Sequence, residues 1–220
     1  MRDFMIYAKR YAESVNYPIR FSWYDAMTNE GPRNHYNAVN GYNDYFVKPR
    51  GGVIPGDEFF INFNWTKYGN EGTAEHMKMI GRSPYDAYAG FELQQNSINT
   101  GIRWDELISS KDRKAIVSIG LFTPDSILGL SKDGEDYHVQ ERNFWTGYEG
   151  DPSLSKDRHG WRGMSRFVSD YSPVTSTPFK TFFNTGHGKA WFENGEMSRD
   201  YDWNARGVSE VLPTCLLYTS

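Results

Sequence analysis

Residues 23–25 place two large aromatic side chains, Trp23 and Tyr24, beside the carboxylate of Asp25 at the end of a predicted strand. Aromatic rings stack on the flat apolar faces of sugars, and a carboxylate beside them accepts hydrogen bonds from sugar hydroxyls. Similar groups end other predicted strands: Asn62, Asn64 and Trp65; Glu92, Gln94 and Gln95; Thr123 and Asp125; Asn184 and His187. Five strand ends of the same character predict one shared site suited to a sugar.

Most glycosidases use two acidic groups across the bond that they cut. Asp25 and Glu92 are one such candidate pair, and a retaining mechanism would place their carboxyl groups about 5–5.5 Å apart. Each residue also has a structural interpretation. Asp25 could form the turn that begins at Thr28, and Glu92 could pair with Arg103. Trp65 could simply cover the core.

His187, between Gly186 and Gly188, could be a metal ligand or a base. A structural role in a tight turn fits better, because no second His or Cys lies at ligand spacing. The sequence also contains no Walker or dinucleotide fingerprint. We therefore expect neither a metal nor a cofactor.

The overall composition excludes several classes of partner. The 24 basic and 28 acidic residues give a net charge of −4, too mild for a nucleic-acid or charged-membrane partner. No apolar run approaches the roughly 20 residues of a transmembrane helix. The one cysteine, Cys215, lies in the last six residues, so the rest of the chain can form no disulfide or zinc–thiolate site. The 36 aromatic residues in a chain with a mean hydropathy of −0.70 suit sugar binding.

Hydrophobic periodicity predicts the elements that position these groups. Residues 1–15 form a helix whose predicted inner face holds Phe4, Tyr7, Ala8, Tyr11, Ala12 and Val15. Predicted strands follow at 17–26, 58–65, 85–95, 114–122 and 178–188. Further helices are predicted at 73–81, with Thr73 as N-cap and Gly81 as stop, and around 104–110. The pattern leaves the helical content of 123–178 open.

Strands separated by helices or long loops indicate a parallel α/β sheet. Within residues 89–94, Gly90, Glu92 and Gln94 share one face, and alternate residues share the other. The polar face should open toward the mouth of a barrel, where catalytic sites of this class lie. Because a closed barrel takes about 250 residues, we expect a partial (β/α)8 TIM barrel with about five C-terminal strands, its first strands missing.

Seven blocks in this order carry a family resemblance: SWYDAMTNEG, HYNAVN, EFFINFNW, YAGFELQQ, SIGLFTPD, FNTGHG and VLPT. Together they resemble glycoside hydrolase family 85, the endo-β-N-acetylglucosaminidases. The sequence of the blocks is most similar to that of large secreted bacterial members. The resemblance implies a TIM-barrel catalytic domain. It also implies an N-linked glycan or glycoprotein as substrate, cut between its two core N-acetylglucosamine residues.

The resemblance further implies a mechanism with one catalytic acid. The 2-acetamido oxygen of the substrate attacks C1 and forms an oxazoline, a known exception to the two-carboxylate rule. A glutamate acts as acid and then base, and an asparagine two residues before it orients the acetamide. This pair belongs to the strand before Trp23, so we expect no catalytic residue in this chain and no turnover by it.

The same resemblance assigns the substrate-binding residues. Tyr24 would lie beside the reacting acetamide, with Asp25 nearby. Trp65 would stack on a core sugar, Glu92 would bind sugar hydroxyls, and Asn184 would contribute from the last strand. Some relatives carry Trp-Gln-Asn where this chain has His35-Tyr36-Asn37, so the resemblance implies no particular glycan preference.

The expected organisation is barrel over residues 1–207 and, over 208–214, the start of a linker to a β-sandwich domain. Residues 215–220 (CLLYTS) are interpreted as a sequencing or cloning artefact, because they can be back-translated into a transposon adapter end. For a bacterial parent we expect secretion or a cell-surface location, with a cytosolic location as the alternative. Two other functions stay open: a retaining glycosidase that uses Asp25 and Glu92, and a non-catalytic carbohydrate-binding protein.

Overall fold

The structure is a computed structural model that describes residues 1–151, 160–168, 176–178, 186 and 188–203. The chain divides into two units, Met1–Phe167 and Val168–Ser220, and each is described by itself. Within the described residues, no helix is both long and apolar enough to cross a membrane.

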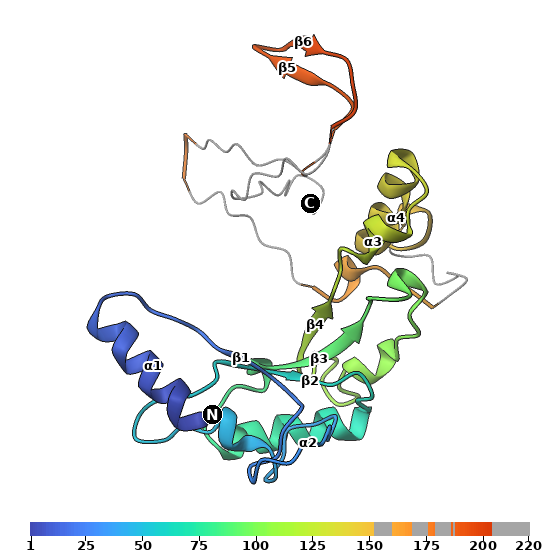
Figure 1. Cartoon of the computed structure of the whole chain (residues 1–220). Coiled ribbons are helices and arrows are strands. Elements are labelled where there is room, and N and C mark those ends of the chain that lie inside the picture. The colour runs from blue at the N-terminus through green and yellow to red at the C-terminus, as the bar shows by residue number, and fades with distance from the viewer. Residues whose placement is uncertain (152–159, 169–175, 179–185, 187, 204–220) are drawn as a thin grey trace. The chain divides into compact units, whose positions relative to one another are not determined.

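The first unit is built on a four-stranded parallel sheet (Figure 1). Its strands are β1 (Ser22–Tyr24), β2 (Glu58–Ile61), β3 (Ala87–Glu92) and β4 (Ser118–Phe122), in the order β1-β2-β3-β4. The predicted parallel α/β sheet is confirmed, although each strand is shorter than its apolar pattern. The fifth predicted strand, 178–188, falls almost wholly outside the described residues.

The two faces of the sheet differ as the alternation predicts. One face is buried along β2 and β3, at Phe59, Ile61, Ala87, Ala89 and Phe91, and partly buried at Trp23, Ile119 and Leu121. Residues paired in register on the other face include the row Tyr24, Phe60, Tyr88 and Ser118 and the row Gly90 and Gly120. This second face is more polar and richer in glycine, as expected of the face toward a barrel interior.

Helix α1 (Arg2–Ser14) exists as predicted, but its predicted inner face is wrong except at Ala12, which is buried. Phe4, Tyr7 and Tyr11 are 60–68% exposed, whereas Met5 and Lys9 lie on the buried side. Lys9 is buried because its ammonium pairs with the carboxylate of Asp57 at 2.6 Å. Periodicity identifies the faces of a helix, but only the neighbouring elements decide which one is covered.

Helix α2 (Lys67–Met79) begins six residues before the predicted start. Its N-cap is Thr66, whose hydroxyl accepts the backbone N–H of Gly69. The sequence pattern missed the start of the helix because Gly69 and Gly72 have low helix propensity. Thr73, predicted as the cap, is buried mid-helix and accepts the backbone N–H of Val39 at 2.9 Å. The predicted stop is right, because Gly81 adopts φ +76° just past the helix.

The region that periodicity left open contains two helices, α3 (Ser126–Leu130) and α4 (Gly134–Thr146). Asp133 caps α4 by accepting the backbone N–H of Asp136 at 2.8 Å. The helix predicted around 104–110 is a single 3₁₀ turn, Trp104–Leu107. Further 3₁₀ turns are Asp44–Phe46, Pro84–Asp86, Ser97–Asn99, Tyr148–Gly150 and Met164–Arg166.

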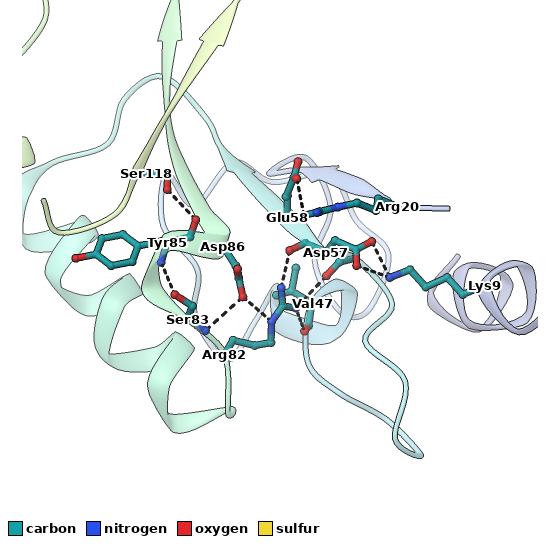
Figure 2. A network of polar contacts seen from close by, with 11 residues as sticks. Lys9, Arg20, Val47, Asp57, Glu58, Arg82, Ser83, Tyr85, Asp86 and Ser118 are labelled. Atoms are coloured by element: carbon teal, nitrogen blue, oxygen red, sulfur yellow. Dashed lines mark hydrogen bonds and ion pairs between the residues drawn. The ribbon is translucent and has the colours of Figure 1, made fainter. Parts of the chain in front are cut away.

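Arg82 fastens the amino-terminal edge of the sheet (Figure 2). Arg82 is 7% exposed, and its guanidinium donates to the carbonyls of Val47, Gly56 and Asp57 at 2.6–2.9 Å. It also pairs with the Asp86 carboxylate at 2.9 Å. One cation thus satisfies three buried carbonyls from the chain that leads into β2.

In the second unit, β5 (Trp191–Glu193) and β6 (Glu196–Arg199) form an antiparallel hairpin. Its turn is Asn194-Gly195, with φ +52° and +84°, which suits the Asn-Gly preference of two-residue hairpin loops. The rings of Trp191 and Trp203 stack at a centroid distance of 4.8 Å. The sequence pattern did not predict this hairpin.

Candidate active site at the carboxyl edge of the sheet

Tyr24 is the aromatic residue at the carboxyl end of β1. Its side chain is 38% exposed and lies among the rings of His35, Phe60 and Phe63, at centroid distances of 5.7, 5.9 and 6.3 Å. Burial and, to a lesser degree, the charge of Asp25 raise the pKa of Tyr24 above its ordinary value of 10.0. The phenol is therefore protonated at neutral pH, with an accessible ring in an aromatic surround.

Asp25, one residue later, lies on the opposite side of the sheet. Its backbone N–H donates to the carbonyl of Phe60 at 2.9 Å, so the strand alternation continues through it. The carboxylate is 0% exposed and accepts from the backbone N–H groups of Tyr36 and Asn37 at 3.3 and 2.6 Å and from the Asn43 amide at 3.1 Å. Asp25 therefore anchors the loop that follows β1.

The electrostatics of Asp25 follow from this burial. Desolvation raises the pKa of its carboxyl above 3.8, and the hydrogen bonds from Asn37, Tyr36 and Asn43 oppose part of that rise. Its oxygens accept hydrogen bonds from the protein, so in this structure Asp25 holds the loop that follows β1. The carboxylate thus anchors residues 36–43 in place of the predicted turn at Thr28, and its contact with a sugar stays a prediction.

Trp65 belongs to the core. It is 2% exposed, its ring stacks on Phe91 at 6.0 Å, and its indole N–H donates to the carbonyl of Gly90 at 2.8 Å. Arg103 lies over the same ring at 5.3 Å and donates to the Trp65 carbonyl. The predicted stacking of Trp65 on a sugar finds no open ring face here, and the structure favours the alternative in which Trp65 covers the core.

Glu92 ends β3 on the same face of the sheet as Tyr24. It is half-buried, and its Oε1 accepts the backbone N–H of Gln94 at 2.9 Å. The alternative partner, Arg103, pairs with Glu106 instead, at 3.4 Å. Glu92 is thus placed where its prediction requires, at the carboxyl edge.

The alternative retaining pair does not fit this geometry. Asp25 and Glu92 point to opposite faces, and β2 separates the strands that carry them. Two carboxylates in this arrangement cannot flank one glycosidic bond. Asn184 and His187, the remaining predicted residues, lie outside the described residues.

Phe60 is a site residue that the sequence pattern did not single out. Its ring fills the space above Gly90 and Gly120, where a Cβ atom would come within 2.5 Å of ring carbons. The signal was the pair of glycines at matched register in neighbouring strands, because missing Cβ atoms often mark a close approach. The Phe60 ring thus packs beside Tyr24 and covers Gly90 and Gly120, which form the floor of the site.

An amide network also escaped the sequence pattern. The Tyr24 hydroxyl donates to Oδ1 of Asn62 at 2.5 Å, and Nδ2 of Asn62 donates to Oδ1 of Asn37 at 2.9 Å. The same Asn37 oxygen accepts the backbone N–H of Asn64 at 3.1 Å. Asn37 adopts φ +54°, a conformation in which asparagine is over-represented. Asn62 thus joins the Tyr24 phenol to Asn37, which lies in the loop after β1.

The chain matches the model of Glycosyl hydrolase family 85 over residues 1–191. It belongs to this family. Family 85 members are glycoside hydrolases, so the polar, aromatic edge of the sheet is the side on which to seek a sugar site. None of the curated proteins matches the chain.

The family 85 chain is also similar to a solved structure. It shares 47% identity and a TM-score of 0.82 with the glycoside hydrolase domain of Endo-D from Streptococcus pneumoniae R6. The match covers 93% of this chain and 32% of that one, so the chain spans about a third of the solved protein's length. A partial TIM barrel is consistent with the four parallel strands.

The comparisons do not test the predictions about a metal ion and about the catalytic residues. Within the described part of the chain, no three His, Cys, Asp or Glu side chains are arranged to hold a metal ion. The one Asn-x-Glu spacing in the sequence, Asn194-Gly195-Glu196, lies at the β5–β6 hairpin and not at the end of a parallel strand. The hairpin turn accounts for that spacing without a catalytic role.

Proposed function

We propose that this chain is the sugar-holding part of an endo-β-N-acetylglucosaminidase that cuts the N,N′-diacetylchitobiose core of N-linked glycans. The observation that carries this proposal is the 47% identity with the Endo-D glycoside hydrolase domain over 93% of the chain. The family match and the polar, aromatic carboxyl edge of the parallel sheet support it.

The proposed reaction is substrate-assisted. The acetamido oxygen of the first N-acetylglucosamine attacks its own C1 as the bond to the leaving oxygen breaks, and an acid protonates that oxygen. Water then opens the oxazoline with retention at C1, and a sugar hydroxyl in place of water gives transglycosylation. The glycan leaves with one N-acetylglucosamine, and the other stays on asparagine.

The residues of this chain would bind and orient the sugar. Tyr24, at the mouth, would meet the acetamide, and Phe60 and Phe63 would pack on its apolar parts. Glu92, at the carboxyl end of β3, would accept hydrogen bonds from sugar hydroxyls. The proton donor would come from the Asn-x-Glu strand that the family resemblance places before Trp23, so the 220 residues alone should bind without cleaving.

Two measurements test this function. Titration of the chain with N,N′-diacetylchitobiose, followed by NMR, should show saturable binding that shifts Tyr24 and Phe60. Incubation of the chain with a glycoprotein bearing N-linked glycans should release no glycan by mass spectrometry. An in-frame strand with Asn-x-Glu, encoded upstream of Met1, should restore release when included. Glycan release by the 220 residues alone, or no binding of N-acetylated sugars, would contradict the proposal.

The location of the parent protein is a separate proposal. For a bacterial parent we propose secretion or display on the cell surface, where glycoprotein substrates are met. Fractionation of the source organism, with detection by an antibody to the chain, checks this. Recovery in the cytosolic fraction alone would favour the cytosolic alternative.

A further inference from the structure

A pocket of about 550 Å³ lies in the first unit, on the side of the sheet opposite to Tyr24 and Phe60. One of its walls is Phe167, whose ring stacks on Trp104 at a centroid distance of 4.5 Å. Trp104 in turn packs edge-on against Phe91, a residue of the buried face, at 5.5 Å. The pocket therefore lies over the buried face of the sheet, apart from the candidate sugar site.

The lining of this pocket concentrates positive charge. It contains four cations and one carboxylate, an excess of three positive charges: Lys67, Arg113, Arg162, Arg166 and Asp105. The chain as a whole carries −4, so this excess is a local feature. Glu106 does not line the pocket, and its carboxylate pairs with Arg103 at 3.4 Å and accepts the backbone N–H of Lys67 at 2.9 Å.

Asp105, the lining carboxylate, is engaged by one of the arginines. The guanidinium of Arg162 donates to both of its oxygens, at 2.7 and 3.2 Å. This hydrogen bonding and the charge of Arg162 hold the pKa of Asp105 below 3.8, and the charges of Arg166 and Arg113 lower it further. Asp105 thus offsets one cation, and the lining keeps its excess of positive charge.

The hydrophobic core fixes the segment that carries two of the cations. Trp161 and Met164 are each 2% exposed and belong to the core cluster. Arg162 follows Trp161 directly, and Arg166 lies two residues after Met164 at the end of a 3₁₀ turn. Both guanidinium groups therefore extend from a backbone that is held in place without a ligand.

Arg113 extends from a tight turn. Its backbone N–H donates to the carbonyl of Ser109 at 3.1 Å, and the N–H of Ser109 donates to the carbonyl of Lys114 at 2.8 Å. Arg113 adopts φ +60°, a region that arginine rarely occupies. Within the part of the chain that the structure describes, its guanidinium forms no hydrogen bond or ion pair. Its donors are therefore available to a ligand.

These donors suit an anion with several oxygens. Guanidinium groups bind phosphate in a bidentate manner, and an ammonium binds it as a point charge. Because Lys67 donates to the Ser110 hydroxyl, that hydroxyl keeps its own proton for a further acceptor. Three excess positive charges match a phosphate dianion better than a single carboxylate.

The size of the pocket calls for more than a bare ion. Its volume lies within the range of about 300–1,000 Å³ that is typical of small-molecule sites. Phe167 and Ile108 also line it and offer an apolar surface beside the cations. An anion that carries an organic group of the size of a sugar fits both features.

We propose that Lys67, Arg113 and Arg162 form the centre of a binding site for a phosphate monoester of a sugar-sized alcohol. This site goes beyond the proposed function and does not depend on it, because the two sites lie on opposite sides of the sheet.

Isothermal titration calorimetry of the 220-residue chain with glucose 6-phosphate tests the proposal. Binding should be saturable and stronger than the binding of inorganic phosphate, because the organic group adds contacts with the apolar wall. Glucose, which lacks the anion, should give no detectable binding.

Two substitutions should change this affinity in opposite directions. Arg113→Ala removes a lining guanidinium and should weaken the binding of glucose 6-phosphate at least about tenfold, as expected for one charge-assisted hydrogen bond. Asp105→Asn removes the lining carboxylate and should strengthen binding several-fold, because its repulsion of the anion is lost.

The matched control is Lys111→Ala. Lys111 is an exposed cation close to Arg113 in sequence, but it does not line the pocket. Its removal should change the affinity by less than about twofold, because salt screens a cation that makes no contact with the ligand. Circular dichroism checks that each variant is folded, and Asp105→Asn tests the proposal if Arg113→Ala is not.

Several results would overturn this site. They are the absence of saturable binding of glucose 6-phosphate, equal affinity for inorganic phosphate, equal effects of Arg113→Ala and Lys111→Ala, or no gain from Asp105→Asn. The affinity for N,N′-diacetylchitobiose should be the same in all three variants. Loss of the phosphate result alone therefore leaves the proposed function standing.

Discussion

The ring of Phe60 on β2 occupies the space that a side chain on Gly120 of β4 would need. A Cβ atom at Gly120 would lie 2.5 Å from Cε2 of Phe60, far inside van der Waals contact. Gly90, on the strand between them, is overlain by the same ring. The floor of the candidate site is therefore one aromatic ring laid across two glycines.

Gly120→Ala should displace Phe60 and so weaken both the fold and the site. Overpacking of this kind costs about 1–3 kcal/mol in the free energy of unfolding, measured by urea denaturation. The affinity for N,N′-diacetylchitobiose should fall with it, because Phe60 packs against Tyr24.

Gly72→Ala serves as the control for that substitution. Gly72 lies within α2, and a Cβ atom there meets nothing within 4 Å. Because alanine has the higher helix propensity, this variant should be about 0.5–1 kcal/mol more stable than wild type, with unchanged sugar affinity. If the Gly120→Ala protein were as stable as Gly72→Ala, the Phe60 ring would be able to move aside at little cost in free energy, which would contradict this prediction.

Arg82→Ala should be among the most destabilising single substitutions in the first unit. It leaves the carbonyls of Val47, Gly56 and Asp57 without their donor and the Asp86 carboxylate without its cation. Breaking a buried charged network in this way costs about 3–5 kcal/mol, which urea denaturation would detect.

The exposed pair between Arg20 and Glu58, at 3.0 Å in the same region (Figure 2), provides the comparison. Arg20→Ala should cost no more than about 1 kcal/mol, because solvent screens an exposed ion pair. Equal costs for the two arginines would mean that the three carbonyls find other donors.

Asp25→Asn should loosen the loop that follows β1 without unfolding the sheet. Tyr36, Asn37 and Asn43 all donate to the carboxylate, so the NH₂ group of asparagine must face a donor and leave it unsatisfied. The cost should be about 1–3 kcal/mol. Hydrogen exchange at the amides of Tyr36 and Asn37 should accelerate, while exchange within β3 stays slow.

The pH dependence of that cost has a definite sign. Burial raises the pKa of folded Asp25 above 3.8, so folded protein holds this proton more tightly than unfolded protein. Its contribution to stability is therefore fully present below the unfolded pKa and is lost as pH rises through the folded pKa.

The measurement is the difference in unfolding free energy between wild type and Asp25→Asn. This difference should shrink as the pH rises from below 3.8 through the raised folded pKa, because only the wild type loses the contribution of that proton. A difference that grows over this range would show that the hydrogen bonds outweigh desolvation and that the folded pKa is lowered.

Sequence alone determined the parallel α/β character, the alternation in β3 and the family. These are local properties, because apolar periodicity and strand alternation depend on neighbours one to four residues away. The blocks around Trp23, Phe60 and Gly90 carried the family in the same way. The face of Glu92 was predictable for this reason, since it follows from the alternation within its own strand, while its role in sugar binding stays a prediction.

Only the tertiary structure decided which groups are free to meet a ligand. The sequence suggested that Asp25 and Trp65 face a ligand, but in the structure the Asp25 carboxylate accepts the backbone N–H of Asn37 and the Trp65 ring stacks on Phe91. The same applies to α1, whose aromatic stripe faces outward because Lys9 pairs with Asp57. Burial and hydrogen-bond partners depend on residues far away in sequence, so no local pattern could specify them.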